Sequence, residues 1–172
     1  MIWLLCLLSI APAAELEKVE HPWRVEVGPV AMWWKSASRH LIAPGAHLSV
    51  RHAYRHLGIT YDVVGAIPHQ PGPSYDIQYL RLHQAVMVSG FLGPSVVRGH
   101  AGLGPSMSIL HTAWRRDGET DTVTQVVPGV RWNAGMEGQF LSHGTWSWRI
   151  GGVATSFASM DFDLGFSLGG EF

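Results

Sequence analysis

The segment that decides the fold is residues 160–172, MDFDLGFSLGGEF. From Phe162 onward every second residue is apolar or glycine, and the acids Asp163 and Glu171 fall on the other phase. Because successive side chains of a β-strand point to opposite faces, the pattern predicts a strand with one apolar and one polar face. A soluble β-protein turns the apolar face of such a strand inward, whereas a β-barrel embedded in lipid turns it outward.

The composition fits one folded domain. The chain has 172 residues, of which 47% are hydrophobic, only 15% are charged and 20 are glycine. This is too apolar for a disordered chain and too rich in glycine for a helical bundle. The formal net charge is −1, and the sequence has neither a zinc-finger spacing nor a basic stretch interleaved with aromatics, so we expect no nucleic-acid partner.

Residues 1–14, MIWLLCLLSIAPAA, are interpreted as a secretory signal peptide. The run is apolar, carries an A-x-A cleavage motif at residues 11–13, and is shorter than the ~20 residues that a transmembrane helix needs. It lacks a basic residue at its start, which leaves a buried N-terminal strand as the alternative. Residues 15–22 form a short leader, and residues 23–172 form the folded domain.

Eight runs with a period of two follow one another, broken by clusters of Gly, Pro, Ser, Asp or His. They cover residues 24–34, 46–56, 58–67, 76–88, 95–113, 126–140, 145–156 and 161–172. Their connections alternate between longer polar stretches and tight turns. The run 76–88 fits least well, because Arg81 and Gln84 fall on opposite phases, so a β-bulge is expected there.

Strand length and aromatic placement favour a strand set embedded in a membrane. The runs match the ~9–11 residues that cross a bilayer at a tilt. Aromatic residues cluster near strand ends, and residues 23 and 33 lie about 23 Å apart along a tilted strand, close to the ~25 Å apolar band of a membrane barrel. The predicted aromatic girdle consists of Trp23, Trp33, Trp34, Trp114, Trp146 and Trp148.

We therefore predict an all-β fold, a closed eight-stranded antiparallel up-and-down transmembrane barrel. Apolar side chains face lipid, and polar side chains fill the interior. The last strand, 161–172, has to pair with the first, because an unpaired strand edge is not tolerated in lipid.

Charged side chains on the inward phase are expected to pair across the lumen. The ten predicted members of this interior network are Arg24, Glu26, Arg51, Asp62, Arg98, Arg131, Glu137, Arg149, Asp163 and Glu171, and Arg55 shares their phase. The interior of an eight-stranded barrel is just wide enough for its side chains, and buried charges are costly unless paired. This favours a lumen filled by Arg–Asp/Glu pairs over a narrow ion path, which remains the alternative.

The sequence indicates no catalytic residue, metal ligand or cofactor. The ten histidines show no metal-binding spacing and are interpreted as interfacial or compositional. Candidate pieces of a serine–histidine–acid site at the outer rim form no motif; they are His40, His111, Ser156, Ser159 and Asp161. The glycine-rich stretch GHAGLGP is not followed by the Lys-Ser/Thr of a phosphate loop.

The signal, the eight alternating segments and the final FxLxFxLxGxF pattern resemble small bacterial outer-membrane β-barrels of the OmpA-transmembrane-domain, OmpX and OmpW type. The strings GHAGLGPSMSIL (99–110) and GMEGQFLSHGTWSWRIGG (135–152) are similar to a mid-barrel strand and the last periplasmic hairpin of those proteins. The resemblance implies an outer-membrane location, a periplasmic leader, and outer-membrane lipids and lipopolysaccharide as surroundings. It also implies a monomer, and an insertion signal at Phe166, Leu168 and Phe172 that is read by the barrel-insertion machinery.

The expected function is a structural or interaction role in the cell envelope. Three alternatives stay open: a lipid A-modifying enzyme of the outer membrane, a narrow channel, and a soluble secreted eight-stranded barrel that binds a ligand. The predicted outer loops are short, about five to twelve residues, which weakens an adhesin role. Among them, Trp114 and the following RRDGETD are the best contact candidates.

Overall fold

The computed structural model describes residues 22–36, 39–54, 56–67, 69–71, 76–94, 96–116, 119–140, 142–155 and 160–172. The predicted signal peptide and most of the predicted leader lie outside these ranges, as do Arg55, Ser156 and Ser159. The assignment of residues 1–22 therefore stays a prediction.

No helix in the described part of the chain is long and apolar enough to cross a membrane.

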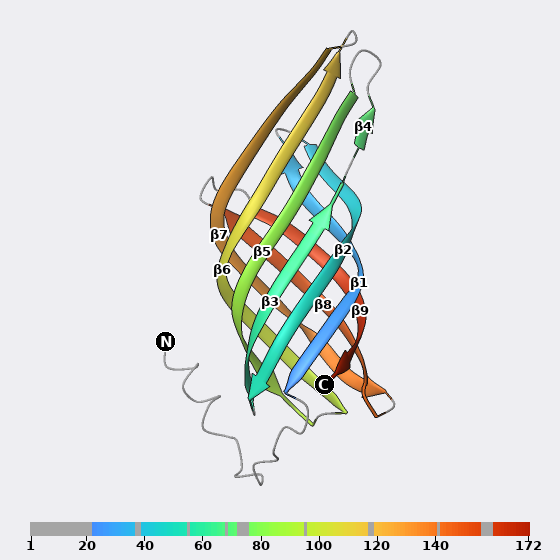
Figure 1. Cartoon of the computed structure of the whole chain (residues 1–172), viewed down its shortest axis with the longest axis vertical. Helices are drawn as coiled ribbons and strands as arrows, with labels where there is room; N and C mark the ends of the chain where they lie inside the picture. The colour runs from blue at the N-terminus through green and yellow to red at the C-terminus, as the bar shows by residue number, and fades with distance from the viewer. Residues whose placement is uncertain are drawn as a thin grey trace.

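The strands form one closed antiparallel barrel (Figure 1). They are β1 (Trp23–Ser36), β2 (Arg39–Tyr54), β3 (Leu57–Ala66), β4 (His69–Pro71), β5 (Asp76–Leu92), β6 (Val97–Arg116), β7 (Glu119–Phe140), β8 (Gly144–Thr155) and β9 (Met160–Glu171). The sheet order runs β3-β2-β1-β9-β8-β7-β6-β5-β4, and an additional β3–β5 pairing closes the ring. Since β4 pairs with β5 in the register of β3, it continues β3 and the wall has eight strands, as predicted.

The closing contact joins β9 to β1, from Trp33↔Phe162 to Arg24↔Glu171. At its end Phe172 N–H donates to the Trp23 carbonyl at 2.8 Å, and Trp23 N–H donates to the Phe172 carbonyl at 3.2 Å. The ladder between the closing strands thus extends to Phe172, and a wall in contact with lipid requires such closure.

The wall is apolar outside and polar inside. Val27 and Leu103, on outward phases, are 61% and 60% exposed, whereas Asp62 and Arg131, on inward phases, are 0% exposed. A barrel in water would gain from the reverse arrangement, because burying charge costs free energy and burying apolar surface yields it. The arrangement is that of a transmembrane barrel, and it excludes the soluble-barrel alternative.

The strands β2, β5 and β7 are longer than predicted, and β6 ends three residues later than predicted. Residues 39–45 and 119–125, expected in loops, are paired strand, and so are Arg115 and Arg116. In Figure 1, β5, β6 and β7, with the short β4 beside β5, rise beyond the rest of the wall, at the end away from the C-terminus. We name residues 76–80, 110–116 and 119–128 of these strands the outer extension. The predicted third outer loop is therefore mostly β-sheet.

Proline positions explain why these strand ends were missed. In the sequence Pro44 and Pro128 indicate loops, because proline has no N–H group to donate a hydrogen bond to a neighbouring strand. Each lies one residue beyond the end of a neighbouring ladder: β2–β3 begins at Gly45↔Ala66, and β7–β8 begins at Gly129↔Thr155. The missing N–H therefore falls beyond the paired stretch on that side, while the ladder on the other side continues.

The predicted bulge in the fourth strand is wrong. The β5–β6 register is the same at Asp76↔Arg115 and at Leu92↔Gly99. Gln84 points outward and accepts a hydrogen bond of 2.9 Å from the Tyr61 hydroxyl, so its polar group is satisfied on the outer wall. The irregular alternation of this run therefore comes from the hydrogen-bonded amide of Gln84 on the apolar face and not from an inserted bulge residue.

Candidate functional site

We call the end of the lumen nearer Phe172 the inner end. Its charges are organised around Glu137, which is 0% exposed. This inner layer contains Arg24, Arg51, Arg98, Glu26, Glu137 and Glu171. Arg51 binds the Glu137 carboxylate through two hydrogen bonds of 2.6 and 2.8 Å, and Arg98 Nε donates a third at 2.6 Å. Arg24 lies 3.3 Å from the same carboxylate, so three guanidinium groups share one acid.

The ring of Phe91 supports two of these arginines from within the lumen. The guanidinium carbons of Arg51 and Arg98 lie 4.5 and 4.6 Å from its centroid, a cation–π geometry. Phe91 is the penultimate residue of β5, and an aromatic near a strand end is typical of the membrane interface. The structure buries it instead, because it shares the inward phase of β5 with Met87 and Ser89.

The charged side chains of the middle layer are the most deeply buried in the lumen. It contains Asp62, Asp163, Arg131, Arg149 and His47. Asp62 accepts hydrogen bonds from Arg131 Nε and from Arg149 Nη1, the latter at 2.7 Å, and His47 Nε2 lies 2.7 Å from it. Arg131 also donates to Asp163 at 2.9 and 3.3 Å, which closes a neutral network of two acids and two arginines.

The outer layer was not predicted. Arg81 Nη1 donates to Asp161 at 2.5 Å, and the Arg81 guanidinium lies 4.7 Å from the Trp34 ring centroid. Trp34 is 1% exposed and belongs to an apolar cluster with Met32 and Leu41. The girdle prediction is therefore wrong for Trp34. Trp33 and Trp34 are consecutive in a strand, so only one of them can face lipid.

Each layer is spanned by one ion pair between strands that lie opposite one another. Around the ring, β2 is four places from β7, β3 is four from β8, and β5 is four from β9. These are the strands of Arg51–Glu137, Asp62–Arg149 and Arg81–Asp161, respectively. Across the three layers, six arginines meet six acids, and all ten predicted network residues take part. The lumen is filled by Arg–Asp/Glu pairs.

Three histidines also face the lumen, contrary to the interfacial interpretation. His47, His83 and His100 lie 2.7, 3.3 and 3.6 Å from Asp62, Asp161 and Glu137, one in each layer. The available signal was their phase, because His47 and His100 share the phase of Arg51 and Arg98, which were predicted to face the lumen. Among the described residues, no three potential ligands converge as a metal site.

Two of these histidines lie between a serine hydroxyl and a carboxylate, and His47 is hydrogen-bonded to both groups, whereas His83 is hydrogen-bonded only to the serine. Ser108 Oγ lies 2.7 Å from His83 Nδ1, and Ser167 Oγ lies 2.8 Å from His47 Nδ1. Both hydroxyls belong to buried serines, at 0% and 1% exposure. A nucleophile needs room for a substrate beside it, so we assign no catalytic role to either chain. Of the rim residues weighed as catalytic pieces, Asp161 is engaged by Arg81, while His111 Nδ1 lies 2.7 Å from Thr124 Oγ1.

The remaining girdle and insertion residues are mostly on the outer wall. Trp23 and Trp148 are exposed, Trp33 stacks on Phe162 at 5.6 Å, and Trp146 shares the outward phase of β8. Trp114 lies six residues beyond Ser108 on the inward phase of β6, within the outer extension, and so is not lipid-facing. The predicted insertion-signal residues Phe166, Leu168 and Phe172 are exposed on or beside β9, and their recognition stays a prediction.

Comparisons with known proteins support the fold. No family model and no curated protein matches the sequence. The chain is similar to the crystal structure of Ail, the attachment invasion locus protein of Yersinia pestis, with a TM-score of 0.69 and 10% identity over 90% of this chain and 100% of that one. It is similar to Neisserial surface protein A (TM-score 0.64, 13% identity, 88% and 97% covered) and to the N-terminal barrel domain of Pseudomonas aeruginosa OprF (0.61, 10%, 87% and 97%).

The closed eight-stranded wall, its apolar exterior and its charged interior define the class as a small integral outer-membrane β-barrel. At 10–13% identity the likeness to solved barrels is one of fold, and it confirms at that level the resemblance read from the sequence.

Charge placed on the outer wall should destabilise the barrel according to depth. Ile150→Arg, in the middle of β8, is expected to lower the free energy of unfolding in lipid vesicles by about 2–4 kcal/mol, and Val130→Arg, nearer the outer boundary, by less. Val123→Arg in the outer extension is the control and should stay within about 0.5 kcal/mol of the parent. Urea titration gives all three values. Full stability of the Ile150 variant would place this face in water.

Proposed function

We propose that the protein serves the outer membrane as a structural and interaction component and not as an open pore. The observation that carries this proposal is the stack of three ion pairs between opposite strands, Arg51–Glu137, Asp62–Arg149 and Arg81–Asp161. An ion entering the lumen would have to separate each pair in turn. Separating a buried pair leaves uncompensated charge in the lumen, which is costly, so three pairs in series are a high barrier.

The outer extension is the surface that we propose for contacts outside the membrane. All side chains from residue 119 to 126 of β7 are exposed, and β8 pairs with β7 only from Gly129 onward. Within the described residues, positions 119–128 therefore have a strand neighbour on one side only. Such an edge can accept an extended segment of a partner through main-chain hydrogen bonds, with side chains such as Thr122 and Thr124 beside it.

We also propose that the lipids of the outer membrane, lipopolysaccharide included, surround the apolar wall of a monomer, and that the insertion machinery reads the β9 end. The exposed apolar residues of β9 support both ideas. A lipid A-modifying activity has no specific observation in its favour, because the two histidines with a serine neighbour, His47 and His83, are buried and offer no access for a substrate.

The proposal is tested by fractionation and by conductance. The protein expressed with its N-terminal segment should co-sediment with outer membranes. In planar bilayers the purified barrel should give no unitary current steps in concentrated KCl. Regular ohmic steps from the parent protein would overturn the closed-lumen role and favour the narrow channel.

A further inference from the structure

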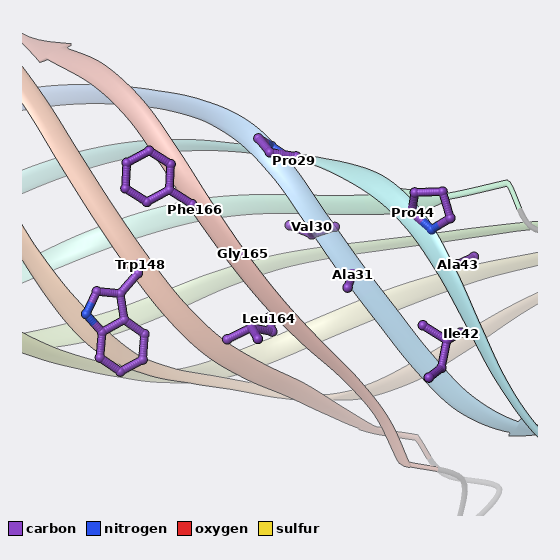
Figure 2. A pocket seen from close by; sticks show the side chains of 10 residues that line it. All are labelled: Pro29, Val30, Ala31, Ile42, Ala43, Pro44, Trp148, Leu164, Gly165 and Phe166. Atoms are coloured by element: carbon purple, nitrogen blue, oxygen red, sulfur yellow. The ribbon is translucent and has the colours of Figure 1, made fainter.

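The lipid-facing wall carries an apolar groove centred on β1 (Figure 2). Its volume is about 560 Å³, and no charged side chain lines it. Figure 2 shows Trp148, Leu164 and Phe166 of β8 and β9 on one side of β1, and Ile42 and Pro44 of β2 on the other. The volume is within the ~300–1,000 Å³ range typical of small-molecule sites.

The groove exists because β1 presents small residues between large ones. Pro29 and Ala31 are its consecutive outward residues, flanked along the strand by Val27 and Trp33. Gly165 of β9 faces Val30 in the register, and both lie on the inward phase, so only their backbone forms the adjoining floor. The result is a hollow running along β1 between the larger outward side chains of β2, β8 and β9.

The outer end of the groove leads to a basic pair. Lys35 and His40 are opposite one another in the β1–β2 register, two positions beyond Trp33↔Ile42. Both are exposed and share the outward phase of Ala31 and Ile42. Lys35 is four residues from Ala31, or about 13 Å along the strand. Among the described outward-facing residues of β1, β2 and β9, no Asp or Glu accompanies Lys35.

We propose that this face is a binding site for one phosphate-bearing lipid of the outer leaflet. An acyl chain lies in the groove along Pro29 and Ala31, and the anionic headgroup meets Lys35, with His40 beside it. The inference rests on the transmembrane placement given above. Apolar lining alone fits any hydrocarbon, but the Lys35–His40 pair at the membrane boundary adds a charge that complements a phosphate.

A second copy of the chain is the competing occupant, and the same features disfavour it. A symmetric contact through this face would bring the two Lys35–His40 pairs toward one another with no acidic partner on the described part of the face. Like charges facing each other oppose association. A phosphate-bearing lipid instead fills the groove with its acyl chain and pairs its anionic headgroup with Lys35.

The experiment measures lipid binding to the purified full-length barrel in detergent by native mass spectrometry. The probes are bis-phosphorylated lipid A, the same lipid without its phosphates, and phosphatidylcholine. We expect one phosphorylated lipid A per barrel, bound at least tenfold more tightly than either other probe. Lys35→Gln combined with His40→Gln should reduce that affinity to the level of the dephosphorylated lipid.

Filling the groove should remove binding of all acylated probes. Ala31→Phe is expected to weaken lipid A binding at least tenfold, and Ala31→Ile is a milder variant that keeps the test valid if the first does not fold. Ala101→Phe is the matched control, a small exposed residue on β6 at the far side of the ring. Parent-like binding by a folded Ala31 variant, or equal affinity for both forms of lipid A, would overturn the proposal. Both results are independent of the conductance assay, so the two proposals can fail separately.

Discussion

Glu137→Gln is expected to lower the free energy of unfolding by about 3–5 kcal/mol, the cost of removing one partner of a buried ion pair. The carboxylate is 0% exposed, accepts two hydrogen bonds from Arg51 and one from Arg98, and lies 3.3 Å from Arg24. A neutral amide of the same shape keeps the packing but leaves the inner layer with one excess positive charge. Urea unfolding of the refolded barrel in vesicles measures the loss.

Glu171→Gln is the matched control in the same layer. Its ion pair with Arg24 is longer, at 3.5 Å, and its side chain is 10% exposed, so the loss should be clearly smaller than that of Glu137→Gln. If the two glutamine variants lost equal stability, the inner layer would depend on total charge and not on the shared carboxylate of Glu137.

The fold could be predicted because lipid makes the alternation strict. In residues 161–172 each outward position must suit hydrocarbon and each inward position must suit a polar lumen, so the phase is readable over the whole segment. Asp163 and Glu171 were assigned to the interior for that reason. Closure of β9 onto β1 followed from the need to pair every backbone group in lipid.

The strand ends and the outer layer could not be predicted by the same rule. Above the bilayer both faces of a strand can be polar, so residues 119–126 lost the alternation although they remain paired with β6. At the outer end of the lumen the inward phase turns apolar, with Met32 and Trp34 in place of charges. An apolar residue there looks lipid-facing in the sequence, and Arg81 looks out of phase.

The partners within the lumen needed the three-dimensional ring. Alternation places Asp62 and Arg149 inside, but their contact at 2.7 Å depends on the relative height of β3 and β8, which face each other across the barrel. That height follows from the stagger accumulated over the intervening strands. The sequence therefore predicts which charged side chains lie in the lumen. Only the register of the strands determines which of them form ion pairs with each other.

Asp62→Asn is expected to be at least as damaging as Glu137→Gln, by about 3–5 kcal/mol in the same unfolding assay. Asp62 accepts from Arg131 and Arg149 and contacts His47, and all four side chains are buried. The asparagine preserves shape, so the loss reports the uncompensated positive charge in the middle layer.

Restoring neutrality within that layer should recover part of the loss. Adding Arg149→Met to Asp62→Asn removes the excess charge, so we expect the double variant to be about 1–3 kcal/mol more stable than additivity of the two single variants predicts. The control adds Arg51→Met, which removes one positive charge from the inner layer, where no contact with Asp62 is formed. That second double variant should be additive. Equal rescue by Arg51→Met would mean that stability depends only on the net charge of the whole lumen. Rescue by Arg149→Met alone would show that charge neutrality is required within each layer separately.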